Sequence, residues 1–124
     1  MKNEFEVTAD AVKNHMKSGK PLFLINVRHH HDWDTSVMKP MGALRIPDDE
    51  MDKHLEEIPR DRPVIICTVC PGDGPSVRAA RFLQQHGWDD VHPLVGGFRA
   101  YLREGLPVDE IGEGSTVRRM MYLS

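Results

Sequence analysis

Apolar residues along the chain gather in short runs that alternate with segments of helical spacing. The runs 21–27 and 63–69 are apolar on both faces and rich in β-branched residues, which is typical of buried parallel strands. Shorter runs at 41–47 and 91–95 predict two further strands. Because strands and helices alternate, the pattern indicates an α/β fold whose sheet is mainly parallel. We expect the strand at 64–69 to lie inside the sheet.

Polar capping residues mark where the helices between these runs begin. Thr8 is a suitable N-cap for the first helix, and Asp48 or Asp49 for the second. Ser76 is predicted to cap the third helix from Val77 onward, which Gly87 ends. The predicted helices cover these segments: 8–16, about 49–58, 77–86 and 98–102.

The size and charge of the chain suit one globular domain. It has 124 residues, of which 40% are hydrophobic, and its formal net charge is −3. We expect one domain over residues 1–110 and a tail over 111–124, which is either mobile or docks its apolar end on this domain or a partner. The lack of a basic patch argues against a nucleic-acid partner. With neither a membrane-spanning apolar run nor a signal peptide in the sequence, we expect a cytoplasmic protein.

The segment that follows the strand at 63–69 carries the most informative chemistry. Cys70 lies where a buried strand gives way to a helix, and Gly72 and Gly74 let the backbone fold back so that several amides converge. A helix N-terminus favours an anion, so we expect a lowered thiol pKa and a nucleophilic thiolate. The same amides suit a persulfide anion. The residues expected to form this anion site are Pro71, Gly72, Asp73, Gly74, Pro75, Ser76 and Val77.

Several short motifs occur in a consistent order along the chain. They are Leu24-Ile25-Asn26-Val27-Arg28, Asp32-Trp33, Gly42-Ala43-Leu44-Arg45-Ile46-Pro47, Val95-Gly96-Gly97-Phe98-Arg99-Ala100-Tyr101 and Gly105-Leu106-Pro107-Val108. Together they resemble the rhodanese (sulfurtransferase) family, and the resemblance extends from about Val7 to Val108. It implies a three-layer α/β sandwich with helices on both faces of a mainly parallel sheet.

The resemblance also implies a sulfurtransferase that works through a persulfide on cysteine. Counting back from Ser76 identifies Cys70 as that cysteine, whereas counting forward from Pro63 points near Cys67 or Thr68. We favour Cys70, because the loop before the helix forms the anion site. The implied partners are a small sulfur donor and a thiol or cyanide acceptor, or a protein persulfide. No metal, organic cofactor, nucleic acid or membrane is implied, and the oligomeric state is left open.

The chain departs from the family pattern at four positions. Pro75 replaces the usual loop arginine, Asp73 adds a negative charge, Asn26 replaces an aspartate, and Lys39 lies nearest to the position of a histidine. A dianion such as thiosulfate needs a nearby cation, so we expect persulfide or polysulfide donors to be preferred. The arginines that lie outside the loop and are candidates for that cation are Arg45, Arg78 and Arg99.

Four other functions compete with sulfur transfer. A non-catalytic rhodanese-like interaction module is compatible with the missing arginine, and Cys67 with Cys70 forms a C-x-x-C that a redox protein would use. Cys67, however, continues a strand, which favours a place in the core. The run 29–31 of three histidines suggests a metal, but adjacent histidines point in different directions. A phosphatase needs a loop arginine, and Arg78 lies inside the predicted helix.

Overall fold

The main sheet has four parallel strands within the part of the chain that the structure describes. The computed structural model describes residues 4–28, 38–68, 74–111 and 117–120. In spatial order the strands of the main sheet are β3 (Leu44–Pro47), β1 (Phe23–Arg28), β4 (Val64–Thr68) and β5 (Val91–Pro93). Strand β4 lies between β1 and β5 and is parallel to both. This confirms the prediction that this strand is interior.

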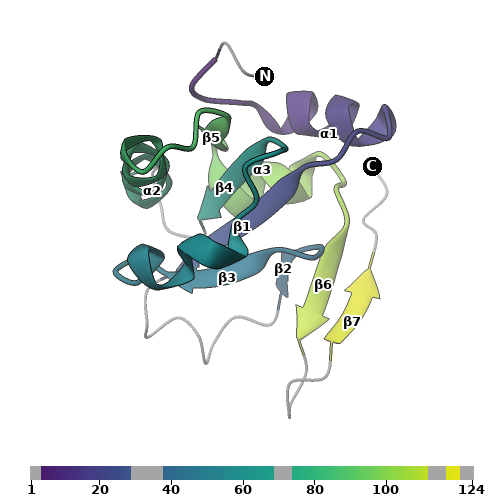
Figure 1. Ribbon diagram of the computed structural model, residues 1–124. Coiled ribbons are helices and arrows are strands. Elements are labelled where there is room, and N and C mark those ends of the chain that lie inside the picture. Colours follow the sequence, from purple (N-terminus) through teal and green to yellow (C-terminus); the bar gives the residue numbers. More distant parts are fainter. Residues whose placement is uncertain (1–3, 29–37, 69–73, 112–116, 121–124) are drawn as a thin grey trace.

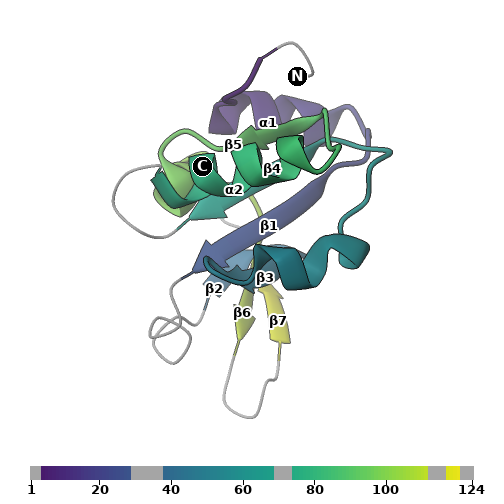
Figure 2. The same cartoon turned by 60° about the vertical axis from the view of Figure 1, so that its left-hand side comes forward.

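Helices cover both faces of this sheet, as predicted (Figures 1 and 2). Helices α1 (Ala9–Lys17) and α3 (Gly97–Arg103) pack on one face. Helix α2 (Gly74–Gln85) and the 3₁₀ helix η2 (Met51–Glu57) pack on the other. The faces alternate along β4, because Ile65 contributes to the core under α1 and α3 whereas Ile66 contributes to the opposite core. Burial on both faces explains why the strands are apolar throughout.

The predicted N-cap is correct for α1 but wrong for the element that follows β3. Thr8 caps α1, and its side chain accepts a hydrogen bond from the Ala11 backbone N–H at 3.2 Å. The prediction of a helix capped by Asp48 or Asp49 is wrong in type and in cap. The element is the 3₁₀ helix η2, and Glu50 precedes it without a side-chain capping bond. Prolines bound this short connection on both sides, and short connections commonly take the tighter 3₁₀ form.

A second, antiparallel sheet lies beside the first. It contains β2 (Met38–Pro40), β6 (Val108–Ile111) and β7 (Val117–Met120) in the order β2-β6-β7. These strands were not predicted. Strand β7 falls in the tail at 111–124, so this part of the tail pairs with the same chain rather than with a partner. The domain boundary at residue 110 stays a prediction.

The segment before α1 runs along the outer edge of β5. The Val7 N–H donates to the Pro93 carbonyl at 3.1 Å, and the Val95 N–H donates to the Val7 carbonyl at 2.9 Å. The buried ring of His92 contacts the Glu4 carbonyl through Nδ1 at 2.6 Å. These bonds extend the sheet by one short bridge beyond β5.

Candidate active site

The predicted reactive cysteine belongs to the connection between β4 and α2. Strand β4 ends at Thr68, which is buried, and α2 begins at Gly74. Cys70 and its neighbours Pro71, Gly72 and Asp73 lie outside the described residues. The connection leaves the carboxyl end of an interior parallel strand, which is the edge at which ligands bind in open α/β sheets.

The other predicted site residues form the first turn of α2. The prediction that Ser76 caps a helix starting at Val77 is wrong, because the helix begins at Gly74. Pro75 fits in the first turn because its missing N–H is one that has no intrahelical partner in any case. Ser76 is fully buried. The helix therefore starts closer to Cys70 than predicted, which shortens the connection that carries the thiol.

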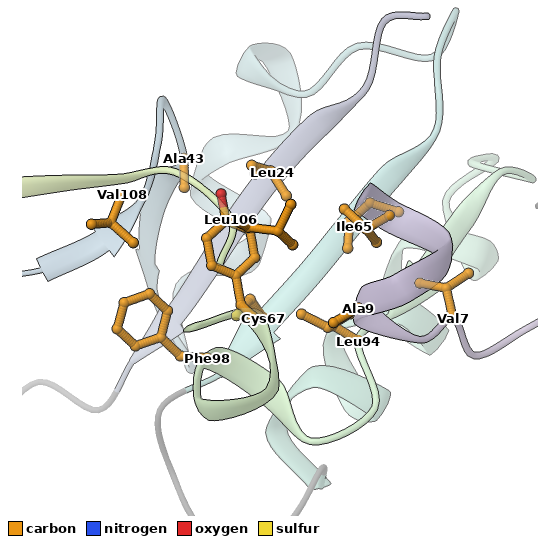
Figure 3. Close-up of a cluster of buried hydrophobic side chains, with 12 residues drawn as sticks. Val7, Ala9, Leu24, Ala43, Ile65, Cys67, Leu94, Phe98, Leu106 and Val108 are labelled. Atoms are coloured by element: carbon orange, nitrogen blue, oxygen red, sulfur yellow. The ribbon is translucent and has the colours of Figure 1, made fainter. Parts of the chain in front are cut away.

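Cys67 has the surroundings of a core residue. Its side chain is fully buried in β4 and packs in the cluster that includes Ile65, Leu94 and Phe98 (Figure 3). Burial raises the pKa of the Cys67 thiol far above its ordinary range. The thiolate, not the thiol, is the reactive form, so this environment suppresses the reactivity of Cys67.

Two glycines bring α3 against the end of β4. Gly97 has a φ of +57°, and a Cβ added there would lie 2.3 Å from the Thr68 carbonyl oxygen. Gly96 has a φ of +78°, and its added Cβ would lie 2.8 Å from the Cβ of Ala100. Only glycine fits both the backbone conformation and the space. The Gly-Gly pair thus fixes the position of Thr68, the last described residue before the Cys70 connection.

Buried polar residues are concentrated at the carboxyl end of β1. Asn26 and Arg28 are buried there, and Asn26 pairs in register with Arg45 on one side and Cys67 on the other. Asn26 Nδ2 donates to the Cys67 carbonyl at 3.5 Å, and its Oδ1 has no hydrogen-bond partner among the described residues. Burial and the neighbouring Arg28 guanidinium lower the pKa of Arg45. Two cationic side chains therefore lie close together near the end of the sheet that carries Cys70.

The register of β1 and β3 creates this polar group, and sequence patterns alone did not reveal it. Arg45 is seventeen positions after Arg28 in the sequence, and parallel pairing brings the two strands together. The sequence of β1 does point to a polar site, since Asn26 and Arg28 interrupt an otherwise apolar buried strand.

Arg78 provides a cation beside the first residue of α2. A Cβ added at Gly74 would lie 3.2 Å from Arg78 Nη1, so the guanidinium folds back toward the helix start. Arg78 is exposed. Of the three candidate cations Arg45, Arg78 and Arg99, Arg78 has its guanidinium beside Gly74, where the Cys70 connection ends.

Lys39 holds two strands of the second sheet together. Its ammonium group forms an ion pair with Asp109 at 3.1 Å, and the Gly42 N–H donates to the same carboxylate at 2.9 Å. Both side chains are largely buried, so this pair joins β2 to β6 in the second sheet.

The histidine run 29–31 and the pair Asp32-Trp33 lie outside the described residues. Within the described ranges, no group of three histidine, cysteine or acidic side chains is placed to hold a metal ion. No helix in those ranges has the length and apolar character needed to cross a bilayer.

The four-stranded parallel sheet with helices on both faces defines a class of α/β proteins in which ligands bind beyond the carboxyl ends of the strands. The model of the rhodanese-like domain family matches residues 8–104. The chain belongs to the rhodanese-like domain family.

Individual relatives agree with this assignment. A sulfurtransferase from Allochromatium vinosum is 27% identical over 103 residues, which are 83% of this chain and 92% of the relative. The thiosulfate sulfurtransferase GlpE from Actinobacillus pleuropneumoniae is 30% identical over 86 residues, 69% of this chain and 76% of the relative. The solution structure of a rhodanese-like domain from Anabaena sp. has a TM-score of 0.73 and 24% identity, with 91% of this chain and 84% of that chain covered.

Proposed function

We propose that the protein is a sulfurtransferase that carries a sulfane sulfur on Cys70. The observation that carries the proposal is the position of the β4–α2 connection. It leaves an interior parallel strand at Thr68 and enters a helix N-terminus at Gly74, where an anionic sulfur is stabilised. The burial of Cys67 leaves Cys70 as the thiol suited to react. The names of the sulfurtransferase relatives support the same reaction class.

The reaction consists of two displacements at sulfur. The Cys70 thiolate attacks the terminal sulfur of a donor persulfide, a new S–S bond forms, and the donor leaves as its thiolate. An acceptor thiolate then attacks the terminal sulfur on Cys70 and takes it as a new persulfide, which restores the Cys70 thiolate. The sulfane sulfur passes from donor to acceptor and the Cys70 thiolate is restored, so the complete cycle needs no external oxidant or reductant. Cyanide accepts in the same way and gives thiocyanate.

Mass spectrometry after incubation with glutathione persulfide tests this proposal. We expect the mass of one added sulfur atom on the peptide that contains Cys70, and its removal when a thiol acceptor is added. The Cys67→Ser variant serves as the matched control and should retain the adduct, whereas Cys70→Ser should lose it. An adduct on Cys67 would reverse the assignment. Absence of any adduct on a folded protein would favour the alternative of a non-catalytic interaction module. The replacement of the loop arginine by Pro75 is compatible with that alternative.

The charge of the Cys70 connection predicts the class of donor. Asp73 is three residues after Cys70, and thiosulfate is a dianion, so a carboxylate about 4 Å from it in water would disfavour binding by about 2 kcal/mol, or about 1 kcal/mol for each charge of the dianion. We therefore expect better transfer from a persulfide or polysulfide than from thiosulfate. The test compares kcat/KM for the donors on the unmodified chain and on Asp73→Asn. Efficient use of thiosulfate that the substitution leaves unchanged would refute the electrostatic argument.

A redox role for the pair Cys67 and Cys70 gives a different result in a simple assay. If the protein transfers sulfur through Cys70, we expect both cysteines to be reduced thiols in the folded protein. A thiol titration of the denatured chain under non-reducing conditions should find both of them. A stable disulfide whose reduction controls activity would replace sulfur transfer with redox chemistry.

A further inference from the structure

An apolar pocket lies at the end of the main sheet opposite to the Cys70 connection. Its volume is about 540 Å³, which is within the roughly 300–1,000 Å³ of ordinary ligand pockets. Its walls come from the last turns of α1, the start of β1, the turn after β2 and the segment before β6. The apolar residues that line it are Met16, Leu22, Phe23, Leu24, Met41, Leu106 and Pro107. A hollow of this character favours an apolar occupant.

Two lysines contribute to the same wall. Lys13 and Lys17 are one helical turn apart on α1 and line the pocket. Among the described residues neither ammonium group has an ion-pair partner. Lysine stems pack well against apolar side chains while the ammonium group stays in water. The pocket therefore suits an occupant that is mainly apolar and has a polar group at its rim.

The described end of β7 lies close in register to the wall of this pocket. Strand β7 runs antiparallel to β6, and its last residue, Met120, pairs with Val108. Leu106 and Pro107, which come just before β6, both line the pocket. If the same register continued by two residues, Tyr122 would lie opposite Leu106. The next residues of the chain, Met121, Tyr122 and Leu123, are themselves apolar or aromatic.

We propose that the chain's own segment 121–123 occupies this pocket, with Tyr122 as its anchor. Three features on separate parts of the molecule agree. The pocket is apolar, the segment is apolar, and the β6–β7 register ends at Val108, next to the lining residues Leu106 and Pro107. The tyrosine ring suits the apolar wall and its hydroxyl suits the rim near Lys13 and Lys17. The inference does not rest on sulfur transfer, because the pocket is at the amino end of β1 and the Cys70 connection is at the carboxyl end of β4.

Isotope-labelled methionine methyl groups report on this occupancy in the full-length chain. Met16 and Met41 line the pocket, whereas Met51 is buried on the opposite face of the sheet. We expect Tyr122→Ala to shift the Met16 and Met41 methyl signals, because the ring current of the tyrosine is lost, and to leave Met51 unchanged. The matched control is Thr116→Ala, which lies just before β7 and should move none of the three signals. Unchanged Met16 and Met41 signals in Tyr122→Ala would overturn the proposal.

Binding of anilinonaphthalene sulfonate, an apolar anion, gives an independent measurement. The double variant Tyr122→Ala/Leu123→Ala should bind this probe at least about tenfold more tightly than the unmodified chain, with shifts at Met16 and Met41. Equal affinity for both proteins would mean that the pocket is open to outside ligands, contrary to the proposal. Methyl shifts that depend on protein concentration would instead assign the occupant to a second copy of the chain, which also contradicts it.

Discussion

The two ends of the main sheet differ in chemistry although the same strands form both. At the amino end, β1 begins with Phe23 and Leu24, and the surroundings are an apolar pocket. At the carboxyl end, the same strand finishes with Asn26 and Arg28, and β4 finishes with Thr68, all of them buried. Burying polar groups costs stability unless they are hydrogen-bonded. Buried polar side chains are therefore normally held by hydrogen bonds, and their concentration makes the end next to the Cys70 connection the polar end of the sheet.

The largest expected effect separates the two cysteines. Cys70→Ser should lower sulfur-transfer activity by at least about a thousandfold, because it removes the nucleophile. Cys67→Ser should leave the activity of the folded protein within about twofold but lower the free energy of unfolding by about 1–3 kcal/mol, since it places a hydroxyl in an apolar cluster. Activity assays and urea unfolding of both variants measure this. Equal losses of activity in the two variants would contradict the assignment of Cys70 as the nucleophile and of Cys67 as a core residue.

A pair of glycine substitutions compares the two ends directly. Gly97 and Gly42 both have positive φ, but an added Cβ at Gly97 meets the Thr68 carbonyl at 2.3 Å, whereas nothing lies within 4 Å at Gly42. Gly97→Ala should cost about 3 kcal/mol or more, from strain and from the clash. Gly42→Ala should cost about 1 kcal/mol, from backbone strain alone. Chemical unfolding of both variants tests the difference, and similar costs would contradict the close packing at Thr68.

The pH dependence of the free energy of unfolding at alkaline pH should reflect the burial of Cys67. Its pKa is raised in the native state, so above the ordinary thiol pKa of about 8.5 the unfolded chain releases a proton that the native chain keeps. Stability is then full below that pH and falls above it by about 1.4 kcal/mol per pH unit. Tyr101, whose pKa burial also raises, adds a similar loss only above about pH 10. Urea unfolding between these values should show a shallower decline in Cys67→Ala, and an unchanged slope would argue against a buried neutral thiol.

The smallest expected effect concerns charge next to the Cys70 connection. Arg78→Gln should lower kcat/KM for thiosulfate by about threefold, because an exposed cation contributes weakly, and should change a neutral polysulfide less. Arg81 is on the same helix, but its guanidinium lies 3.9 Å over the Phe5 ring. Arg81→Gln is therefore the matched control. Equal effects of both substitutions would mean that only the net charge of the protein matters.

Sequence patterns predicted the elements that are apolar and buried, and they failed where short elements depend on their neighbours. The runs that became β1 and β4 were readily predicted, because burial on both faces leaves no polar alternation. Strand β7 was missed because its pairing with β6 is set by register and not by its own composition. The predicted start of α2 at Val77 is three residues too late, because Gly74 and Pro75 suit a loop as well as the first turn of a helix. Proline is tolerated in a first turn, so its presence there is ambiguous.

The candidate site was predictable only in part for a related reason. The position of Cys70 between strand and helix follows from the sequence. The proximity of Arg78 to Gly74, and of Arg28 to Arg45, depends on side-chain direction and strand pairing. Neither is encoded by spacing along the chain.

The N-terminal segment that pairs with the outer side of β5 also protects the molecule from self-association. An uncovered edge strand presents free backbone groups on which a second molecule can add a strand. Here Val7 takes up the Pro93 carbonyl and the Val95 N–H, and β5 is only three residues long. A fusion partner or tag joined close to Val7 competes with this cover. Tags for crystallisation or display are therefore better joined at a distance from this edge, and a chain shortened past Val7 is expected to aggregate through β5.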